Sequence, residues 1–263
     1  MNVFVLNSGS SSLKVQLINT GSKKVLFRAH VDGIGLDSCK VTTAEMSSRK
    51  EVDVSVEKRL RTHSAAIAFI LKIVDHDAID AVGHRVVHGG EYFKAATRIS
   101  PSVVKRVESL NMLAPLHNPP NIAGIKAITR HLPKVPQVAV FDTAFHQTIP
   151  PVAYMYGIPY VYYKKYGIRK YGFHGTSHKY IMQQTQKMLG KRSINMVSCH
   201  IGNGSSVCAI QNSKSIDTSM GFTPLPGIIM GTRSGDIDPE IIGFLEEKEH
   251  LSTHELKAML NKK

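Results

Sequence analysis

Short apolar runs separated by polar turns open the chain. Asn2–Leu6, Leu13–Ile18 and Lys24–Ala29 each have the length and alternation of a β-strand. A serine-rich turn, Asn7–Ser12, separates the first two. The pattern therefore predicts an antiparallel three-stranded meander at the start of the chain.

Helical spacing of apolar residues begins after this meander. We expect helices at Lys58–Val74, from Pro101 to about Met112 behind the N-cap Ser100, and at Asn121–His131. Strands are expected between them, at Ala81–His88 and Pro136–Phe141. Strands that alternate with helices after a meander predict an α/β fold with a mixed sheet.

The opening pattern returns in the second half of the chain. Strands are expected at Ile194–His200, Val207–Ile210 and Ser215–Thr218, with the turn Gly202–Ser206 between the first two. Chance similarity of two hairpin turns is the alternative, but the shared three-strand context favours an internal duplication. We therefore predict two domains that meet at a cleft, residues 1–148 and residues 149–263.

The elements around the second meander are also readable. Thr176 is expected to cap a helix that Gly190 ends, and Pro150–Tyr166 is expected to cross between the units. A helix should start at Asp238-Pro239, and Ser252–Glu255 has the form of a capping box for a final helix. Few residues follow the third strand of this meander, so the second domain is expected to be incomplete.

Composition narrows the class of protein. Of the 263 residues, 42% are hydrophobic and 20% are charged, which excludes a disordered chain. The formal net charge of +13 suits an anionic partner. A nucleic-acid binder is a weaker alternative, because the basic residues are dispersed and no tryptophan is present. We expect no nucleic-acid partner, no membrane association and a cytoplasmic protein whose three cysteines are reduced.

Two turns could hold phosphate. Ser8–Ser12, followed by Lys14, offers backbone N–H groups and hydroxyls to an anion, and Gly202–Ser206 offers the same in the second half. A plain serine-rich hairpin is the alternative for either turn alone. The P-loop motif is missing, and so is a G-x-G-x-x-G after a strand, which excludes the two commonest nucleotide motifs.

Four clusters share histidine, arginine, glycine and aspartate. They are Gly83–Gly90, Phe141–His146, Tyr171–His178 and Met230–Asp236. Each lies at a strand end or in a loop, where catalytic groups tend to sit. Together they supply arginines, imidazoles and a carboxylate, which suits phosphoryl transfer to an anionic acceptor, because that chemistry depends on positioning and charge neutralisation.

These motifs resemble those of the acetate kinases, within the acetate and sugar kinase/Hsp70/actin superfamily. The resemblance rests on Asn7–Lys14, the four clusters, Leu113–Pro120, His200–Gly204 and Asp217–Gly221, in the family's order. It implies two duplicated ribonuclease-H-like (actin-like ATPase) domains with mixed sheets. It also implies ATP as substrate, Mg²⁺ with Mn²⁺ as an alternative, a homodimer, and reversible transfer of phosphate between ATP and acetate.

The resemblance also assigns residues to roles. It implies three catalytic residues, Asp142, His174 and Arg233. Substrate binding falls to Arg85, for the carboxylate or phosphoryl group, and to the methyl-pocket residues Val87, Leu116, Phe173 and Pro224. ATP contacts fall to Lys14 and the second phosphate loop, His200, Ile201, Gly202, Asn203 and Gly204, and the metal contact falls to Asn7.

Two departures from the family pattern bear on activity. Pro226 stands where the family usually has glutamate, and the family continues beyond the position of Lys263. We expect the 263-residue chain alone to be a weak or inactive kinase. The alternatives are a catalytically incomplete phosphate-binding fragment of such a kinase, and a propionate or butyrate kinase.

Overall fold

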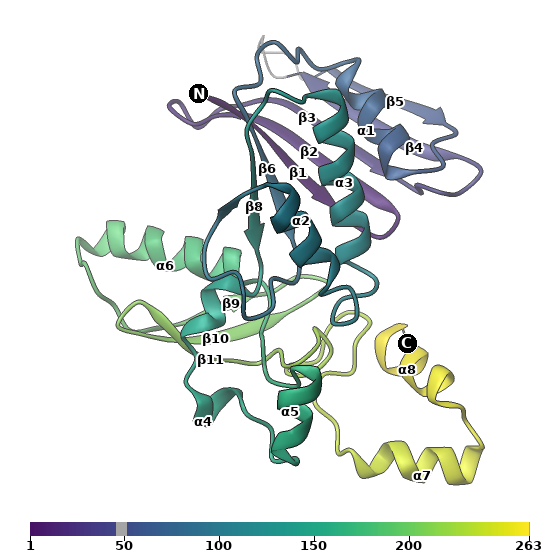
Figure 1. The fold of residues 1–263 in the computed structure, drawn as a ribbon, viewed down its shortest axis with the longest axis vertical. Helices are drawn as coiled ribbons and strands as arrows, with labels where there is room; N and C mark the ends of the chain where they lie inside the picture. Colours follow the sequence, from purple (N-terminus) through teal and green to yellow (C-terminus); the bar gives the residue numbers. More distant parts are fainter. Residues whose placement is uncertain (46–51, 263) are drawn as a thin grey trace. The chain divides into compact units, whose positions relative to one another are not determined.

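The computed structural model describes residues 1–45 and 52–262 and divides the chain into two compact units (Figure 1). Unit 1 comprises Met1–Gly89 and Ala95–Phe141, and unit 2 comprises Gly90–Lys94 and Asp142–Lys263. The boundary expected at residues 148–149 thus falls inside unit 2. The short segment Gly90–Lys94, which joins unit 2 from the middle of unit 1, was not anticipated.

Unit 1 is built on an eight-stranded mixed sheet with the order β5-β4-β3-β2-β1-β6-β8-β7. β1 pairs antiparallel with β2 and parallel with β6, and β6 pairs parallel with β8, as an α/β fold requires. The strands are β1 (Asn2–Ser8), β2 (Ser12–Asn19), β3 (Val25–Asp32), β4 (Cys39–Glu45), β5 (Val52–Lys58), β6 (Ala81–Val86), β7 (Thr97–Arg98) and β8 (Gln137–Phe141). The helices are α1 (His63–Leu71), α2 (Pro101–Glu108) and α3 (Asn118–His131).

Alternation along the strands separates the two faces of this sheet. Phe4, Leu6 and Leu13 belong to the buried core, together with Ile67 of α1 and Ile128 of α3, so these two helices cover that face (Figure 1). The intervening residues point to the opposite face, because successive side chains of a strand alternate. That second face carries polar side chains of the candidate site.

The helix expected at Lys58–Val74 was predicted too long at its N-terminal end. Lys58 ends β5, which pairs with β4 in antiparallel register, and neither strand was anticipated. The helix begins at His63, where the Thr62 hydroxyl accepts a hydrogen bond from the Ala65 backbone N–H at 3.1 Å. Strand pairing upstream therefore displaces the helix start to the first available N-cap.

Unit 2 contains a three-stranded antiparallel sheet in the order β11-β10-β9. The strands are β9 (Met196–His200), β10 (Ser206–Gln211) and β11 (Lys214–Thr218). Its helices are the 3₁₀ helix η1 (Ala144–Thr148), α4 (Pro151–Tyr154), α5 (Tyr160–Tyr166), α6 (Gly175–Leu189), α7 (Glu240–Glu249) and α8 (Thr253–Lys262). This meander is the counterpart of β1–β3 that the sequence predicted.

The ends of the unit 2 helices test the expected caps. Thr176 is not the N-cap of α6: the helix begins at Gly175, behind His174 in the left-handed conformation with φ 56°. Gly190 ends the helix as predicted, with φ 62°. The capping box of α8 is confirmed, because the Ser252 hydroxyl accepts from the Glu255 N–H and the Glu255 carboxylate accepts from the Ser252 N–H.

Of the helices in the described ranges, none has both the length and the apolar character needed to cross a bilayer.

An arginine holds Gly90–Lys94 in unit 2. Arg169 is 4% exposed, and its guanidinium lies 2.6 Å from the Glu91 carboxylate and 3.6 Å from the ring centre of Tyr154. Its Nε also donates to the Lys170 carbonyl at 3.2 Å. A buried guanidinium needs a nearby countercharge, and Glu91 supplies it.

Glu91→Gln is expected to destabilise unit 2 by about 2–3 kcal/mol, because it leaves the Arg169 charge buried without its carboxylate while Glu91 itself is partly solvated. All nine tyrosines of the chain lie in unit 2 and there is no tryptophan, so tyrosine fluorescence during urea unfolding reports on this unit alone. The matched control is Asp217→Asn in the same unit, which breaks an ion pair with Lys170 of the same 2.6 Å length at a carboxylate that is 52% exposed. That control should cost less than about 1 kcal/mol; equal losses would contradict the role of burial.

Candidate functional site

Three of the functional residues expected in unit 1 lie on neighbouring strands of its large sheet. Asn7 is near the end of β1, directly opposite Lys14 on β2. Arg85 is on β6, the other neighbour of β1, and its Nη1 donates to the Asn7 side-chain oxygen at 3.2 Å. The strand register thus gathers Asn7, Lys14 and Arg85 at one place on the sheet.

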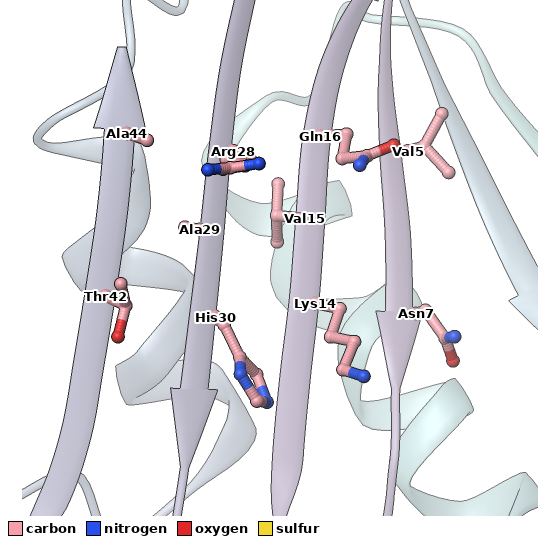
Figure 2. A pocket seen from close by; sticks show the side chains of 10 residues that line it. All are labelled: Val5, Asn7, Lys14, Val15, Gln16, Arg28, Ala29, His30, Thr42 and Ala44. Carbon is pink, nitrogen blue, oxygen red and sulfur yellow. The ribbon is translucent and has the colours of Figure 1, made fainter. Parts of the chain in front are cut away.

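Asn7 and Lys14 line a hollow of about 400 Å³ on the sheet face that α1 and α3 leave open (Figure 2). Figure 2 shows Gln16 on the same strand as Lys14, and Arg28 and His30 on the neighbouring strand β3. Lys14 is paired across the strands with His30, and Gln16 with Arg28. Among the described residues that line the hollow, three carry basic side chains and none carries an acidic one, so an anion would be favoured there.

Asn7 alone supplies too few oxygen ligands to hold a magnesium ion. Mg²⁺ prefers carboxylates and phosphate oxygens, whereas Asn7 offers one amide oxygen that already accepts from the Arg85 guanidinium. Among residues 1–45 and 52–262, no cluster of three His, Cys, Asp or Glu side chains is placed to hold a metal. Asn7 as a metal ligand therefore stays a prediction.

The second phosphate loop connects β9 to β10 in unit 2. The Ser205 hydroxyl accepts from the Gly202 N–H at 3.3 Å and donates to the Gly202 carbonyl at 2.9 Å, which closes the turn. The Gly231 N–H donates to the Asn203 carbonyl at 3.2 Å. A methyl group on Gly231 would overlap the end of the Asn203 side chain, so a larger residue there would require that side chain to move.

A buried histidine holds the segment that carries His174. His146 is 0% exposed, and its Nε2 lies 2.9 Å from the Phe173 carbonyl while its Nδ1 lies 2.8 Å from the Ser215 hydroxyl. Nε2 must donate to the carbonyl, so Nδ1 accepts from Ser215. Burial lowers the pKa of His146 to about 4, outweighing the Phe173 hydrogen bond and the charge of Asp142, which raise it.

Gly172 lets the chain pass this histidine. It adopts φ +70°, and a Cβ there would strike Thr218 and the His146 ring. Further along, the Gly175 N–H donates to the Asp142 carbonyl at 2.9 Å and so ties the start of α6 to the end of the Phe141–His146 cluster. His174 is thereby fixed between two anchored glycines.

His174 and Arg233 converge on the phosphate loop. A methyl group at Gly204 would lie 3.3 Å from Arg233 Nη1 and 3.6 Å from His174 Nε2. Arg233 Nη1 donates to the Pro224 carbonyl at 3.2 Å, and burial lowers the pKa of its guanidinium, although arginine stays charged at neutral pH. His174 stacks on His200 with 4.0 Å between ring centres. The loop, a cation and two imidazoles thus surround one spot.

The remaining predicted residues are distributed over both units. Val87 and Phe173 are buried, Pro224 is half-buried and Leu116 is 69% exposed. Val87 and Leu116 belong to unit 1, Phe173 and Pro224 to unit 2. The methyl pocket therefore stays a prediction. Asp142 is buried, with its backbone engaged at the start of α6.

Sequence reasoning assigned no role to several side chains that contact the expected ones. Arg28 and His30 line the hollow with Lys14, and alternation along Val25–Asp32 was the available signal for them. Ser206 contacts His174, and His178 and Ser198 lie next to it. Nothing in the sequence identifies Ser198, because it is one small residue in a strand, and Ser206 was recognised only as the last residue of the predicted phosphate turn.

Known proteins resemble this chain over its whole length. The family model described as the acetokinase family matches residues 2–263. A protein named acetate kinase from Thermotoga maritima is 51% identical, with 100% of this chain and 67% of that protein covered.

Solved structures agree with the sequence matches. An acetate kinase of Porphyromonas gingivalis superposes with a TM-score of 0.93 at 43% identity, covering 99% of this chain and 67% of that one. A propionate kinase of Francisella tularensis superposes with a TM-score of 0.92 at 42% identity, covering 99% of this chain and 68% of that one. The chain therefore has the same fold as these two structures and is 42–43% identical to them in sequence.

Proposed function

Because the chain belongs to the acetokinase family, we propose that it serves the direct transfer of the γ-phosphoryl group of ATP to acetate. A carboxylate oxygen of acetate attacks the γ-phosphorus, and a new O–P bond forms. The bond from the γ-phosphorus to the bridging oxygen breaks, and ADP leaves with the electron pair. Acetyl phosphate and ADP are the products, and the reaction is reversible.

The unit 1 residues bind anions: Arg85 binds the acceptor, and Lys14 faces the phosphates of ATP. Arg85 binds the carboxylate, because a guanidinium offers two parallel donors to two carboxylate oxygens. Its bond to Asn7 orients it from one side. Lys14, opposite Asn7 in register, contributes a positive charge toward the phosphates of ATP.

The unit 2 residues serve the transferring group. Its negative oxygens need donors and positive charge, which Arg233 and His174 supply. The backbone of His200–Gly204 holds the phosphates, and Asp142 acts as the carboxylate of the site. The observation that carries this proposal is the approach of Arg233 Nη1 and His174 Nε2 to the same glycine, Gly204. Magnesium would accompany ATP on its phosphates.

The substrate is tested by comparing acetate, propionate and butyrate. We would measure kcat/KM in the chain itself and in a chimera that continues it with the part of the T. maritima relative beyond its match. Acetate is expected to exceed propionate by roughly 10- to 200-fold, because one methylene is worth about 1–3 kcal/mol in an apolar pocket. A propionate value above that for acetate would make the chain a propionate kinase, as its likeness to the F. tularensis structure allows.

Val87→Ala should narrow this preference, because it makes room for the extra methylene. The matched control is Val107→Ala, which removes the same two methyl groups from the buried face of α2. The control is expected to lower stability and to leave the ratio of acetate to propionate unchanged. Equal ratios in both variants would place Val87 away from the substrate.

Binding measurements separate the remaining candidates. Conversion of ATP to ADP and acetyl phosphate that depends on added acetate tests for a kinase, and phosphate binding without turnover would favour an anion-binding fragment. We further propose a homodimer in the cytoplasm, as the family resemblance implies. Light scattering of the purified chain tests the dimer, and a monomer at micromolar concentration would refute it.

A further inference from the structure

Imidazoles and hydroxyls alternate in a chain behind His174. His174 Nδ1 lies 2.8 Å from the Ser206 hydroxyl, which lies 2.9 Å from His178 Nε2. His178 Nδ1 lies 3.0 Å from the Ser198 hydroxyl. We call His174, Ser206, His178 and Ser198 the His–Ser relay. All four belong to unit 2, and the last three are at most 3% exposed.

The relay holds few protons, so their positions can be counted. Burial lowers the pKa of His178 to about 4, with smaller contributions from His146 and His200, so at neutral pH its ring carries one N–H. Each serine has one hydroxyl hydrogen. Ser206 therefore donates to one histidine and accepts from the other, because accepting from both would leave its own hydrogen buried without an acceptor.

The hydrogen bonds of the relay can therefore run in one of two directions, or polarities, and the Ser198 hydroxyl distinguishes them. If Ser206 donates to His178, then His178 must donate from Nδ1 to Ser198, and the Ser198 hydrogen has no acceptor among the described residues. In the opposite polarity, Ser198 donates to His178 Nδ1, His178 Nε2 donates to Ser206, and Ser206 donates to His174 Nδ1. Every hydrogen between Ser198 and His174 is then paired, so this polarity has the lower free energy.

We propose that the His–Ser relay holds neutral His174 as the tautomer with its hydrogen on Nε2, and that Ser206 is the positioning residue that fixes it. The Nε2–H then lies on the side of Gly204 and Arg233. Its use as a donor to the transferring phosphoryl group rests on the proposed function. Without Ser206, His174 would divide between tautomers, and the Nδ1–H form presents a lone pair to the anion.

The tautomer is measured directly by NMR of the ¹⁵N-histidine-labelled 263-residue chain, without nucleotide, at pH 8, well above the ordinary histidine pKa. The ring signals of His174 are assigned by their loss in His174→Gln. We expect Nε2 at the protonated position and Nδ1 at the far-downfield, unprotonated position. A His174 ring with its hydrogen mainly on Nδ1 overturns the proposal.

Variants test whether the relay is the cause. Ser206→Ala and Ser198→Ala should each raise the Nδ1–H fraction of His174. Ser213→Ala is the control, because it removes a serine hydroxyl of the same unit whose hydrogen bonds, from the Gln186 side chain and the Ile194 N–H at 3.1 Å each, lie outside the relay; it should leave the His174 signals in place. An unchanged His174 spectrum in Ser206→Ala, or an equal change in Ser213→Ala, overturns the proposal.

Kinetics connect the tautomer to the reaction. In the chimera, Ser206→Ala should lower kcat roughly 10- to 100-fold, as loss of a partner that orients a functional histidine does elsewhere, while KM for acetate stays within about twofold. An unchanged kcat overturns the positioning role. Failure of the unsubstituted chimera to phosphorylate any carboxylate would refute the proposed function, and the NMR result would still decide the relay.

Discussion

Arg233→Ala is expected to lower kcat of the chimera by about 10³–10⁵-fold, which is the range that a transition-state arginine contributes in other phosphoryl transferases. The reason lies in its surroundings. Its side-chain hydrogen-bond partners among the described residues are neutral: the Pro224 carbonyl at 3.2 Å and the Met230 sulfur at 3.7 Å. Among the described residues no carboxylate neutralises this charge, which therefore remains available to the anion beside Gly204.

Two substitutions sharpen this test. Arg233→Lys keeps a charge without the planar pair of donors, so its kcat should fall between wild type and Arg233→Ala. Arg192→Ala removes an exposed arginine of the same unit and should leave kcat unchanged. If Arg233→Ala retains turnover within about threefold of wild type, the arginine does not act on the transferring group.

Unit 2 is expected to lose stability steeply between pH 6.5 and pH 4. Burial lowers the pKa of both His146 and His178 to about 4, whereas in the unfolded chain each should titrate near 6.5. Between these values the unfolded state binds more protons, so the free energy of unfolding falls as pH falls. Each histidine accounts for about 1.4 kcal/mol per pH unit, or ~3 kcal/mol over the whole interval.

Tyrosine fluorescence during urea unfolding at a series of pH values measures this slope in unit 2. His178→Gln should reduce the slope of the free energy of unfolding against pH by about 1.4 kcal/mol per pH unit, the contribution of one proton. His254→Gln, which changes an exposed histidine of α8, should leave it unchanged. A free energy of unfolding that stays level from pH 6.5 to pH 4.5 would mean that these buried rings accept protons without unfolding.

Local pattern predicted much of the fold. The alternation in β1, β2 and β3 is strong, because one face is buried beneath α1 and α3. The strand Val52–Lys58 was missed although Val52, Val54 and Val56 alternate, and the predicted helix took in its last residue, Lys58. The start of α6 was missed for another reason: its first N–H bonds to the distant Asp142 carbonyl, which no local cap signal reveals.

The candidate site was predictable where chemistry is concentrated in the sequence. Asn7, His174 and Arg233 stand in motifs that the sequence singles out, and the structure gives each a hydrogen-bond partner, Arg85, Ser206 and Pro224 respectively; their roles in catalysis stay predictions. Ser198 and Ser206 could not be found in this way. Their importance depends on the antiparallel register of β9 and β10 and on the packing of α6 against them, which is a long-range property.

The contribution of Gly90–Lys94 to unit 2 has a consequence for synthesis on the ribosome. Glu91 precedes its partner Arg169 by 78 residues, which is about 4 to 16 seconds at ordinary rates of translation. During that interval β8, which ends at Phe141, can complete the large sheet of unit 1. Until Arg169 is synthesised, the segment that carries Glu91 lacks its partner and stays exposed to solvent. A substitution at Arg169 would therefore affect a nascent chain whose unit 1 has already been synthesised.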